Sequence, residues 1–304
     1  MKAELKANAT KGPLVWLDMD QQDLDDAYDQ ACWALNREHI AERRRLASER
    51  TIERIGPPQR VAYGPTEIEK LDIYKTKRPN APIAIFIHGG AWKAGASKDS
   101  AYMAEMYLAA GAIFVVPDFV AVQNAGGSLM TMAQQVRRAV AWVYKNAASF
   151  SGDPNRLYLT GHSSGAHLGG TIVITNWQKD FGLPRDILKG ALLISGMYDL
   201  KPVRISKRSK YVNFDDATED ALSTQRHIDK IVTPLIIAHG TLESPEFQRQ
   251  SCDFAAAVKA AGKPIEFFVG EGFNHFEMQE TMGNPFGLGG RATLGQMHLK
   301  LGPK

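Results

Sequence analysis

Apolar segments of strand length alternate with amphipathic segments of helix length along most of this chain. The pattern predicts strands at 60–63, 70–75, 83–87, 112–116, 156–160, 190–195, 235–239 and 265–269, and helices at 102–110, 130–148, 165–175, 218–225 and 247–261. Helices that connect successive strands are typical of βαβ crossovers and of a mainly parallel sheet. The sequence therefore predicts an α/β fold, with an eight-stranded and mainly parallel sheet flanked by helices.

Two features precede the main alternation. Gly64 and Pro65 separate the first two strands, and this pair of turn residues predicts a β-hairpin. Residues 19–55 are rich in helix formers and predict an N-terminal helical arm, with apolar residues at three- or four-residue spacing: Leu24, Tyr28, Ala31 and Leu35. The arm either caps the active site or forms an interface between two copies of the chain, and the sequence leaves both open. Because no linker or repeat interrupts the alternation, we expect residues 1–304 to form one domain.

The composition is that of a globular protein with little net charge. Hydrophobic residues make up 44% of the chain, and 36 Lys and Arg against 33 Asp and Glu leave a net charge of +3, which predicts no nucleic-acid partner. The N-terminal segment carries no apolar run, so we expect a soluble, cytoplasmic protein without a membrane contact. Cys32 and Cys252 cannot build a disulfide framework, and no Cys and His pair has zinc spacing. We therefore expect neither a metal nor another cofactor.

The strongest local motif is a G-x-S-x-G pentapeptide at 161–165, directly after one predicted strand and directly before a predicted helix. A strand-to-helix turn this tight needs small residues on both sides of the central serine, whose hydroxyl is then lifted above the sheet. The bare match is weak evidence, but its placement predicts that Ser163 is a nucleophile.

A serine nucleophile needs a base and a carboxylate that orients the base. In this chain order the base follows the serine, and His275 lies in a loop just past the last predicted strand. The loop after the preceding strand offers Glu243 as the carboxylate, with Glu246 and Asp199 as competitors. The sequence predicts a triad of Ser163, His275 and Glu243.

The oxyanion that forms on attack needs main-chain N–H donors. His88 is followed by Gly89 and Gly90 after a predicted strand, so we expect the amides of these two glycines and of Ser164 to form an oxyanion hole. Asp118 is expected to brace this loop. Three aromatic residues flank the predicted catalytic positions and either shape a substrate pocket or pack in the core: Trp92, Tyr198 and Phe276.

Taken in order, these residues resemble the α/β-hydrolase fold of lipases and esterases with a His-Gly-Gly oxyanion motif, over nearly the whole chain. Four stretches resemble the kynurenine formamidase (arylformamidase) group more than generic esterases: 63–74, 161–168, 195–200 and 243–251. The resemblance implies the same triad and the same oxyanion amides as above. Two residues depart from the pattern of that group, because Glu243 stands where aspartate is usual and Ala91 where tyrosine is usual. The small Ala91 side chain would widen the site and leaves the acyl group open.

Together these features predict a cofactor-free serine hydrolase that cleaves a small amide or ester through an acyl-enzyme. The resemblance implies hydrolysis of N-formylkynurenine to kynurenine and formate, a reaction of tryptophan catabolism. A carboxylesterase for short-chain acyl esters is the alternative. A non-catalytic, ligand-binding member of the fold is a third hypothesis, which the presence of all three triad residues disfavours.

Overall fold

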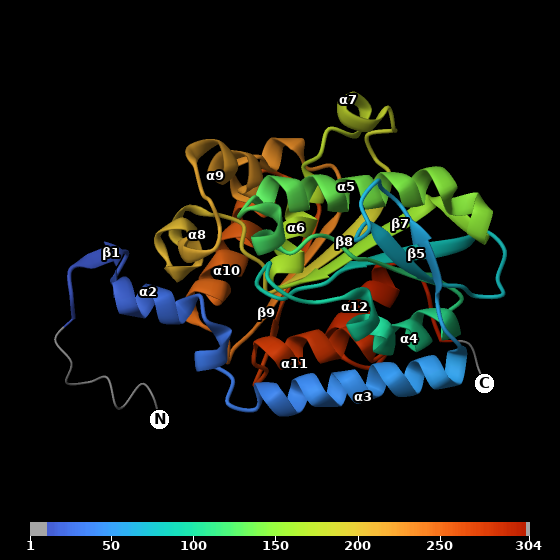
Figure 1. Ribbon diagram of the computed structural model, residues 1–304, viewed down its shortest axis with the longest axis horizontal. Coiled ribbons are helices and arrows are strands. Elements are labelled where there is room, and N and C mark those ends of the chain that lie inside the picture. Colours follow the sequence, from blue (N-terminus) through green and yellow to red (C-terminus); the bar gives the residue numbers. More distant parts are fainter. Residues whose placement is uncertain (1–10, 302–304) are drawn as a thin grey trace.

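A central eight-stranded sheet forms the middle layer of the computed structural model, which describes residues 11–301 (Figure 1). Its strand order is β10-β9-β8-β7-β5-β6-β4-β3. The strands are β3 (Gln59–Ala62), β4 (Lys70–Tyr74), β5 (Ala81–Ile87), β6 (Ile113–Pro117), β7 (Gly152–His162), β8 (Leu188–Ile194), β9 (Leu235–Gly240) and β10 (Ile265–Gly270). All eight predicted strands are confirmed to within a few residues.

Strand direction within the sheet is nearly uniform. β5 to β10 run parallel to one another, whereas β4 runs antiparallel to both β3 and β6. The antiparallel pair of β3 and β4 confirms the hairpin that Gly64 and Pro65 predict. The carboxyl ends of the parallel strands therefore meet at one edge of the sheet, which is where such folds place their ligand sites.

Helices cover both faces of the sheet (Figure 1). One face carries α5 (Leu129–Asn146), α6 (Ser164–Val173), α7 (Trp177–Phe181), α8 (Lys201–Ile205), α9 (Asp216–Leu222) and α10 (Pro245–Ala260). The opposite face carries α3 (Arg37–Ile55), α4 (Ala104–Ala109), α11 (His275–Glu280) and α12 (Leu288–Gln296). The helices predicted at 102–110, 130–148, 165–175, 218–225 and 247–261 correspond to α4, α5, α6, α9 and α10.

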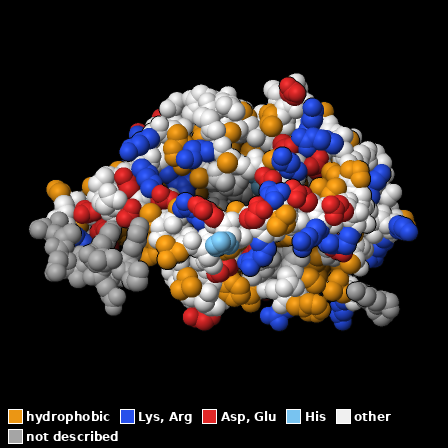
Figure 2. Space-filling model, turned by 60° about the horizontal axis from the view of Figure 1, so that its bottom comes forward, with side chains coloured by type: hydrophobic (Ala, Val, Ile, Leu, Met, Phe, Trp, Pro, Cys, Tyr) orange, Lys and Arg blue, Asp and Glu red, His pale blue; other side chains and the backbone are white. Residues whose placement is uncertain are grey.

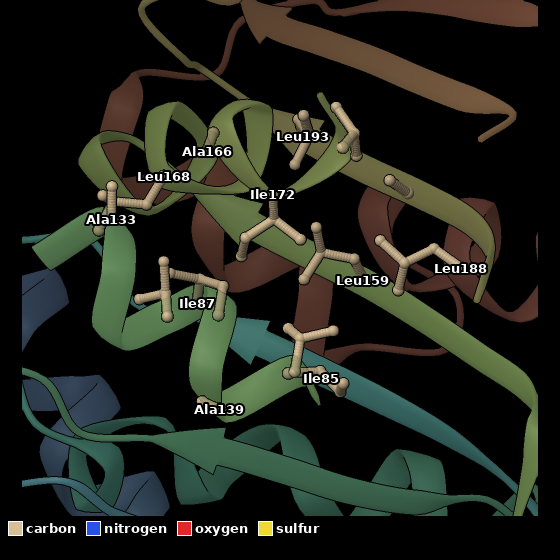
Figure 3. Packing of buried hydrophobic residues seen from close by; sticks show 14 of the residues in the cluster. Ile85, Ile87, Ala133, Ala139, Leu159, Ala166, Leu168, Ile172, Leu188 and Leu193 are labelled. Atoms are coloured by element: carbon tan, nitrogen blue, oxygen red, sulfur yellow. The ribbon is translucent and has the colours of Figure 1, made fainter. Parts of the chain in front are cut away.

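The core consists of two apolar layers, one on each face of the sheet. All seven residues of β5 are buried, and the period of two along a strand sends Ile85 and Ile87 to the layer under α5 and α6 (Figure 3). Phe86, between them, packs in the other layer with Phe114 of β6. Burial on both faces explains why these strands are continuous apolar runs and not alternating ones.

The N-terminal arm is helical, as predicted, but it is broken into separate helices. α2 (Gln21–Ala27) is followed by a 3-10 turn, η1 (Gln30–Cys32), and then by α3, while a short hairpin of β1 (Leu14–Trp16) and β2 (Met19–Asp20) precedes them. Leu24 and Tyr28 are buried as expected, but Leu35 is 91% exposed. The period fails because the chain leaves the helix at Tyr28, so Leu35 no longer lies on the same face.

Within residues 11–301, no helix is both long and apolar enough to span a lipid bilayer.

Candidate active site

Ser163 lies at a sharp turn between β7 and α6. Its backbone is in the left-handed region, with φ of 58° and ψ of −127°, which an L-residue adopts only under constraint. The flanking glycines explain how the turn closes: a Cβ at Gly161 would lie 2.7 Å from the Gly165 carbonyl oxygen, and one at Gly165 would lie 2.0 Å from the Ile87 carbonyl oxygen. Only glycine fits these contacts, so the pentapeptide forms the strained elbow that its sequence predicts.

The Gly165→Ala substitution is expected to lower the free energy of unfolding by about 3 kcal/mol or more, because the neighbouring atoms are backbone and cannot yield. Gly295→Ala is the matched control, since nothing lies within 4 Å of a Cβ at that position near the end of α12. Urea denaturation of both variants tests the prediction. Equal free energies of unfolding for the two variants would contradict the close backbone contacts that the structure has around Gly165.

A continuous chain of hydrogen bonds joins Ser163, His275 and Glu243. The Ser163 hydroxyl donates to His275 Nε2 at 2.8 Å, and His275 Nδ1–H donates to Glu243 Oε2 at 2.7 Å. The exposed fractions of the three residues are only 6%, 4% and 1%. Buried charge-assisted bonds of this kind hold an imidazole in one tautomer and one orientation.

The other carboxylate oxygen of Glu243 is also bound. Its Oε1 accepts from the Ser195 hydroxyl at 2.6 Å and from the Gly240 amide at 2.7 Å. Ser195 follows β8 and Gly240 ends β9, so two strand ends fix the carboxylate. A glutamate side chain is one methylene longer than that of an aspartate. Donors from the two strand ends nevertheless hold the Glu243 carboxylate in a position where it reaches His275.

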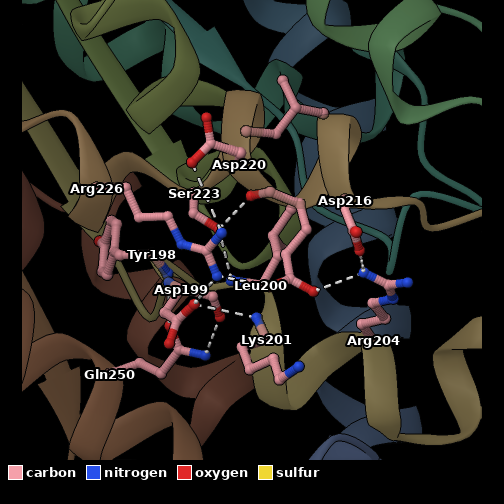
Figure 4. A network of polar contacts seen from close by, with 12 residues as sticks. Tyr198, Asp199, Leu200, Lys201, Arg204, Asp216, Asp220, Ser223, Arg226 and Gln250 are labelled. Carbon is pink, nitrogen blue, oxygen red and sulfur yellow. Dashed lines mark hydrogen bonds and ion pairs between the residues drawn. The ribbon is translucent and has the colours of Figure 1, made fainter.

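The two competing carboxylates lie elsewhere. Glu246 is fully buried and bonded to Tyr28 and, through two contacts, to Arg249. Asp199 accepts from the Lys201 amide and lies 3.6 Å from Arg226, in the polar network that Figure 4 shows. Neither carboxylate contacts His275.

The segment after β5 brings unobstructed amides beside Ser163. A Cβ at Gly89 would lie 3.1 Å from the Ser163 Cβ, and Gly90 has a φ of 121° that favours glycine. Within residues 11–301, the N–H groups of Gly89, Gly90 and Ser164 donate to no protein acceptor. Ser164 also begins α6, whose N-terminus adds a partial positive charge at this point. The arrangement has the donors that an oxyanion would need.

Side-chain contacts brace both ends of this loop. Asp118 accepts from the Ser97 amide at 2.6 Å and forms an ion pair with Arg60, which agrees with the bracing role expected of it. Trp92 Nε1–H donates to His167 Nδ1 at 3.2 Å, while His167 Nε2–H donates to the Leu222 carbonyl. Burial lowers the pKa of His167 to about 3, so the ring stays neutral and keeps accepting from Trp92.

Acid is expected to weaken the contacts by which His167 links Trp92 to the Leu222 carbonyl. The stability contributed by neutral His167 is complete above the unfolded pKa near 6.5 and is lost as the pH falls toward 3, because only the unfolded chain then binds the proton. Between about pH 5 and pH 6, His167→Asn should reduce the slope of unfolding free energy against pH by about 1.2 kcal/mol per pH unit. Urea denaturation across this range measures the slope, and an unchanged slope would contradict the assignment.

His162 is a positioning residue that sequence reasoning left without a role. Its Nε2–H donates to the His275 carbonyl at 2.8 Å, and the two rings lie 4.6 Å apart between centroids. Burial, followed by the nearby His275, lowers the pKa of His162 well below its ordinary value, so it remains a neutral donor. The signal in the sequence for a role at the site was that His162 directly precedes Ser163 in the pentapeptide.

A cavity of about 800 Å³ opens onto Ser163 and His275. Arm residues form one wall of it, including Tyr28, Gln30 and Arg44, and a hollow ringed by basic and acidic side chains is visible in Figure 2. Phe276 lies in the cavity wall, which agrees with the alternative that it shapes a pocket and not with packing in the core. Trp92 and Tyr198 do not: Trp92 is 1% exposed against His167, and Tyr198 stacks on Phe254 in the core. These two aromatic residues pack behind the site and do not line it.

Amide side chains of the arm contact the loops that carry the triad. Asn274, which caps α11 just before His275, donates to Asn36 Oδ1 at 2.8 Å. Gln30 Nε2–H donates at 2.8 Å to the hydroxyl of Ser244, the neighbour of Glu243. The arm thus supports both loops as well as lining the cavity. In the described part of the chain, no group of three His, Cys, Asp or Glu side chains is arranged to hold a metal ion.

A mainly parallel eight-stranded sheet with a serine elbow after its central strand defines an α/β-hydrolase. A family model described as BD-FAE matches residues 71–189. Two kynurenine formamidases are similar over 88% of this chain and 93% of their own length: that of Salmo salar is 30% identical and that of Danio rerio is 28% identical. The chain therefore belongs to the kynurenine formamidase family, and it is a hydrolase.

Esterases are also similar to this chain. Esterase LipQ of Mycobacterium tuberculosis is 27% identical over 66% of this chain and 52% of its own length. Among solved structures, a candidate thioesterase from a Silicibacter species has a TM-score of 0.76 at 20% identity, with 86% of this chain and 95% of that one covered. Esterase LipW from Mycobacterium marinum has a TM-score of 0.67 at 17% identity, with 88% of each chain covered. These structures support the fold.

Proposed function

We propose that this chain is an arylformamidase that hydrolyses N-formylkynurenine to kynurenine and formate. The observation that carries the proposal is the unbroken hydrogen-bonded path from Ser163 through His275 to Glu243, in a chain similar to two kynurenine formamidases over most of its length. Residues of the arm and residues at the edge of the sheet line the same cavity.

Acylation follows from the geometry. As Ser163 Oγ attacks the formyl carbon, its proton passes to His275 Nε2, which lies 2.8 Å away. The negative charge that develops on the carbonyl oxygen is met by the amides of Gly89, Gly90 and Ser164. Glu243 stabilises the imidazolium that forms. The C–N bond then breaks, and His275 returns the proton to the departing arylamine nitrogen.

Deacylation repeats the same steps with water. Water adds to the formyl ester of Ser163 while His275 Nε2 accepts one of its protons. Collapse of the second tetrahedral intermediate breaks the ester bond, and the proton passes to Ser163 Oγ. Formate leaves, and the hydrogen bond between Ser163 and His275 is restored.

A carboxylesterase that acts on short-chain acyl esters is the second candidate. Two observations favour it: the cavity of about 800 Å³ has more room than a formyl group needs, and LipQ is a similar esterase. The small Ala91 side chain lies in the cavity wall and adds to this room.

The two candidates are separated by kcat/KM for N-formylkynurenine and for p-nitrophenyl acetate and butyrate, measured on the full chain. The proposal predicts the largest value for N-formylkynurenine. If the butyrate ester is the best substrate and the formamide is hydrolysed only at the background rate, the carboxylesterase is the correct reading.

A further inference from the structure

Arg208 is a buried cation at the wall of the active-site cavity. It lies in the 3-10 turn η5 (Lys207–Lys210), and only 4% of it is exposed. Its guanidinium carbon lies 5.1 Å from the centre of the Trp92 ring and 6.0 Å from that of Tyr28. Its Nη2 donates to the Tyr28 carbonyl at 3.0 Å. The charge is thereby held between the arm and Trp92, which lies two residues after the oxyanion glycines.

The hydrogen-bonding capacity of this guanidinium is largely unused. Nε and Nη1 of Arg208 are buried and have no acceptor, and no carboxylate among residues 11–301 forms an ion pair with it. Asp29 in the cavity wall feels the charge of Arg208, which contributes to lowering its pKa, but it forms its ion pair with Lys207 at 2.7 Å. Buried arginines are normally paired, because a lone buried charge is costly. Arg204, four residues earlier and only partly buried, does have carboxylate partners, in Asp216 and Glu219.

The rest of the cavity wall has the same excess of positive charge. Besides Arg208, six Lys or Arg residues line the cavity against two Asp residues. Within the described chain, Arg44 donates to Gln279, Lys93 lies over the Tyr211 ring at 4.5 Å, and neither forms an ion pair with a carboxylate. The cavity therefore attracts anions, and Arg208 is the most buried of the cations in its wall.

A purely structural role would make Arg208 a cation–π clamp between the arm and Trp92. That role accounts for the two ring contacts, but it does not account for a cavity-lining guanidinium that lacks an anion. A ligand carboxylate supplies the missing partner, through charge-assisted hydrogen bonds that a neutral ligand cannot make.

We infer that Arg208 binds a carboxylate of the substrate and so selects acyl arylamines that carry an acidic side chain. The inference rests on the proposed function and deepens it, since N-formylkynurenine carries its carboxylate on the amino-acid portion of the leaving group, away from the formyl carbon. Arg208 is thus a specificity-determining residue, and the triad performs the same chemistry on any formamide that reaches it.

The test compares two substrates that differ only in this carboxylate: N-formylkynurenine and its decarboxylated analogue, N-formylkynuramine. In Arg208→Met the ratio of their kcat/KM values should fall by roughly 10- to 100-fold, mainly through KM for the acid. Arg208→Lys should recover part of the ratio, because it keeps the charge. Arg204→Met removes a charge from the same region without changing the cavity wall and should leave the ratio unchanged. If Arg208→Met lowers kcat/KM equally for both substrates, Arg208 acts only as a cation–π contact between the arm and Trp92, and the inference is wrong.

A binding measurement separates failure of this inference from failure of the proposed function. Calorimetric titration of the Ser163→Ala protein with the same two compounds requires no turnover. The inference predicts tighter binding of the carboxylate compound and loss of that preference in Ser163→Ala/Arg208→Met. If the native enzyme hydrolyses neither formamide but this preference is present, the formamidase proposal fails and the carboxylate site stands. If the Ser163→Ala protein binds both compounds equally, the inference is wrong.

Discussion

Ser163→Ala lowers kcat/KM for N-formylkynurenine and for aryl esters by about 10⁴-fold or more, with no loss of stability beyond about 1 kcal/mol. The activity falls because the hydroxyl that donates to His275 Nε2 is the atom proposed to attack the carbonyl carbon, and alanine leaves nothing in its place. Stability is retained because alanine removes one oxygen from a turn that the flanking glycines shape.

A fluorophosphonate probe gives a second measurement of the same claim. The native protein should be labelled on Ser163, whereas Ser163→Ala should not be labelled at all. Ser149→Ala is a matched control, because the Ser149 hydroxyl only donates to the Asn146 carbonyl on the surface. Full activity in Ser163→Ala would exclude the acyl-enzyme mechanism.

Glu243→Gln is expected to reduce kcat by roughly 10³- to 10⁴-fold. The two donors on Oε1, the Ser195 hydroxyl and the Gly240 amide, force the amide oxygen of the glutamine to that side. The NH₂ group then faces His275 Nδ1 and favours the tautomer that carries its proton on Nε2. In that tautomer Nε2 cannot accept the proton of Ser163, so the base is blocked although the geometry is preserved.

The Glu243→Asp variant provides the comparison. It keeps the charge but withdraws the carboxylate by one methylene, so His275 loses a contact that is now 2.7 Å. We expect an intermediate loss of kcat, with a circular dichroism spectrum like that of the native protein. A Glu243→Gln enzyme as active as Glu243→Asp would show that tautomer control is not the role of this residue.

The sheet was predictable from the sequence because its strands are buried on both faces. A run such as Ile83–Ile87 must be apolar throughout, and the helices between such runs keep a separate period. Both signals are local, so they appear without knowledge of tertiary contacts. The order of loops after the strands then places Ser163, Glu243 and His275 at the same sheet edge, which is where the structure has them.

The arm shows where local patterns stop being informative. The spacing from Leu24 to Leu35 favours one helix, but the Asp29 side chain accepts from the Ala31 amide and starts a separate turn. What settles the path is tertiary: Tyr28 donates to Glu246, more than two hundred residues later in the chain. A sequence period does not report such a contact.

The sequence also did not predict which side chains line the cavity. The sequence left Trp92 either at the site or in the core, and a positive φ of 64° and its bond to His167 turn it into the core. Arg208 lies in a basic run at 207–210, and it is buried in contact with Tyr28 of the arm and with Trp92. Which side chains line a cavity depends on how distant segments meet, and no local pattern records that.

Rapid-quench mass spectrometry of the full chain mixed with N-formylkynurenine is the most direct measurement of the mechanism proposed here. It should reveal a transient adduct in which one formyl group replaces one hydrogen, located on the peptide that contains Ser163 and formed as kynurenine is released. Kynurenine release without any formyl adduct on Ser163, or with the same rate in Ser163→Ala, would contradict the account.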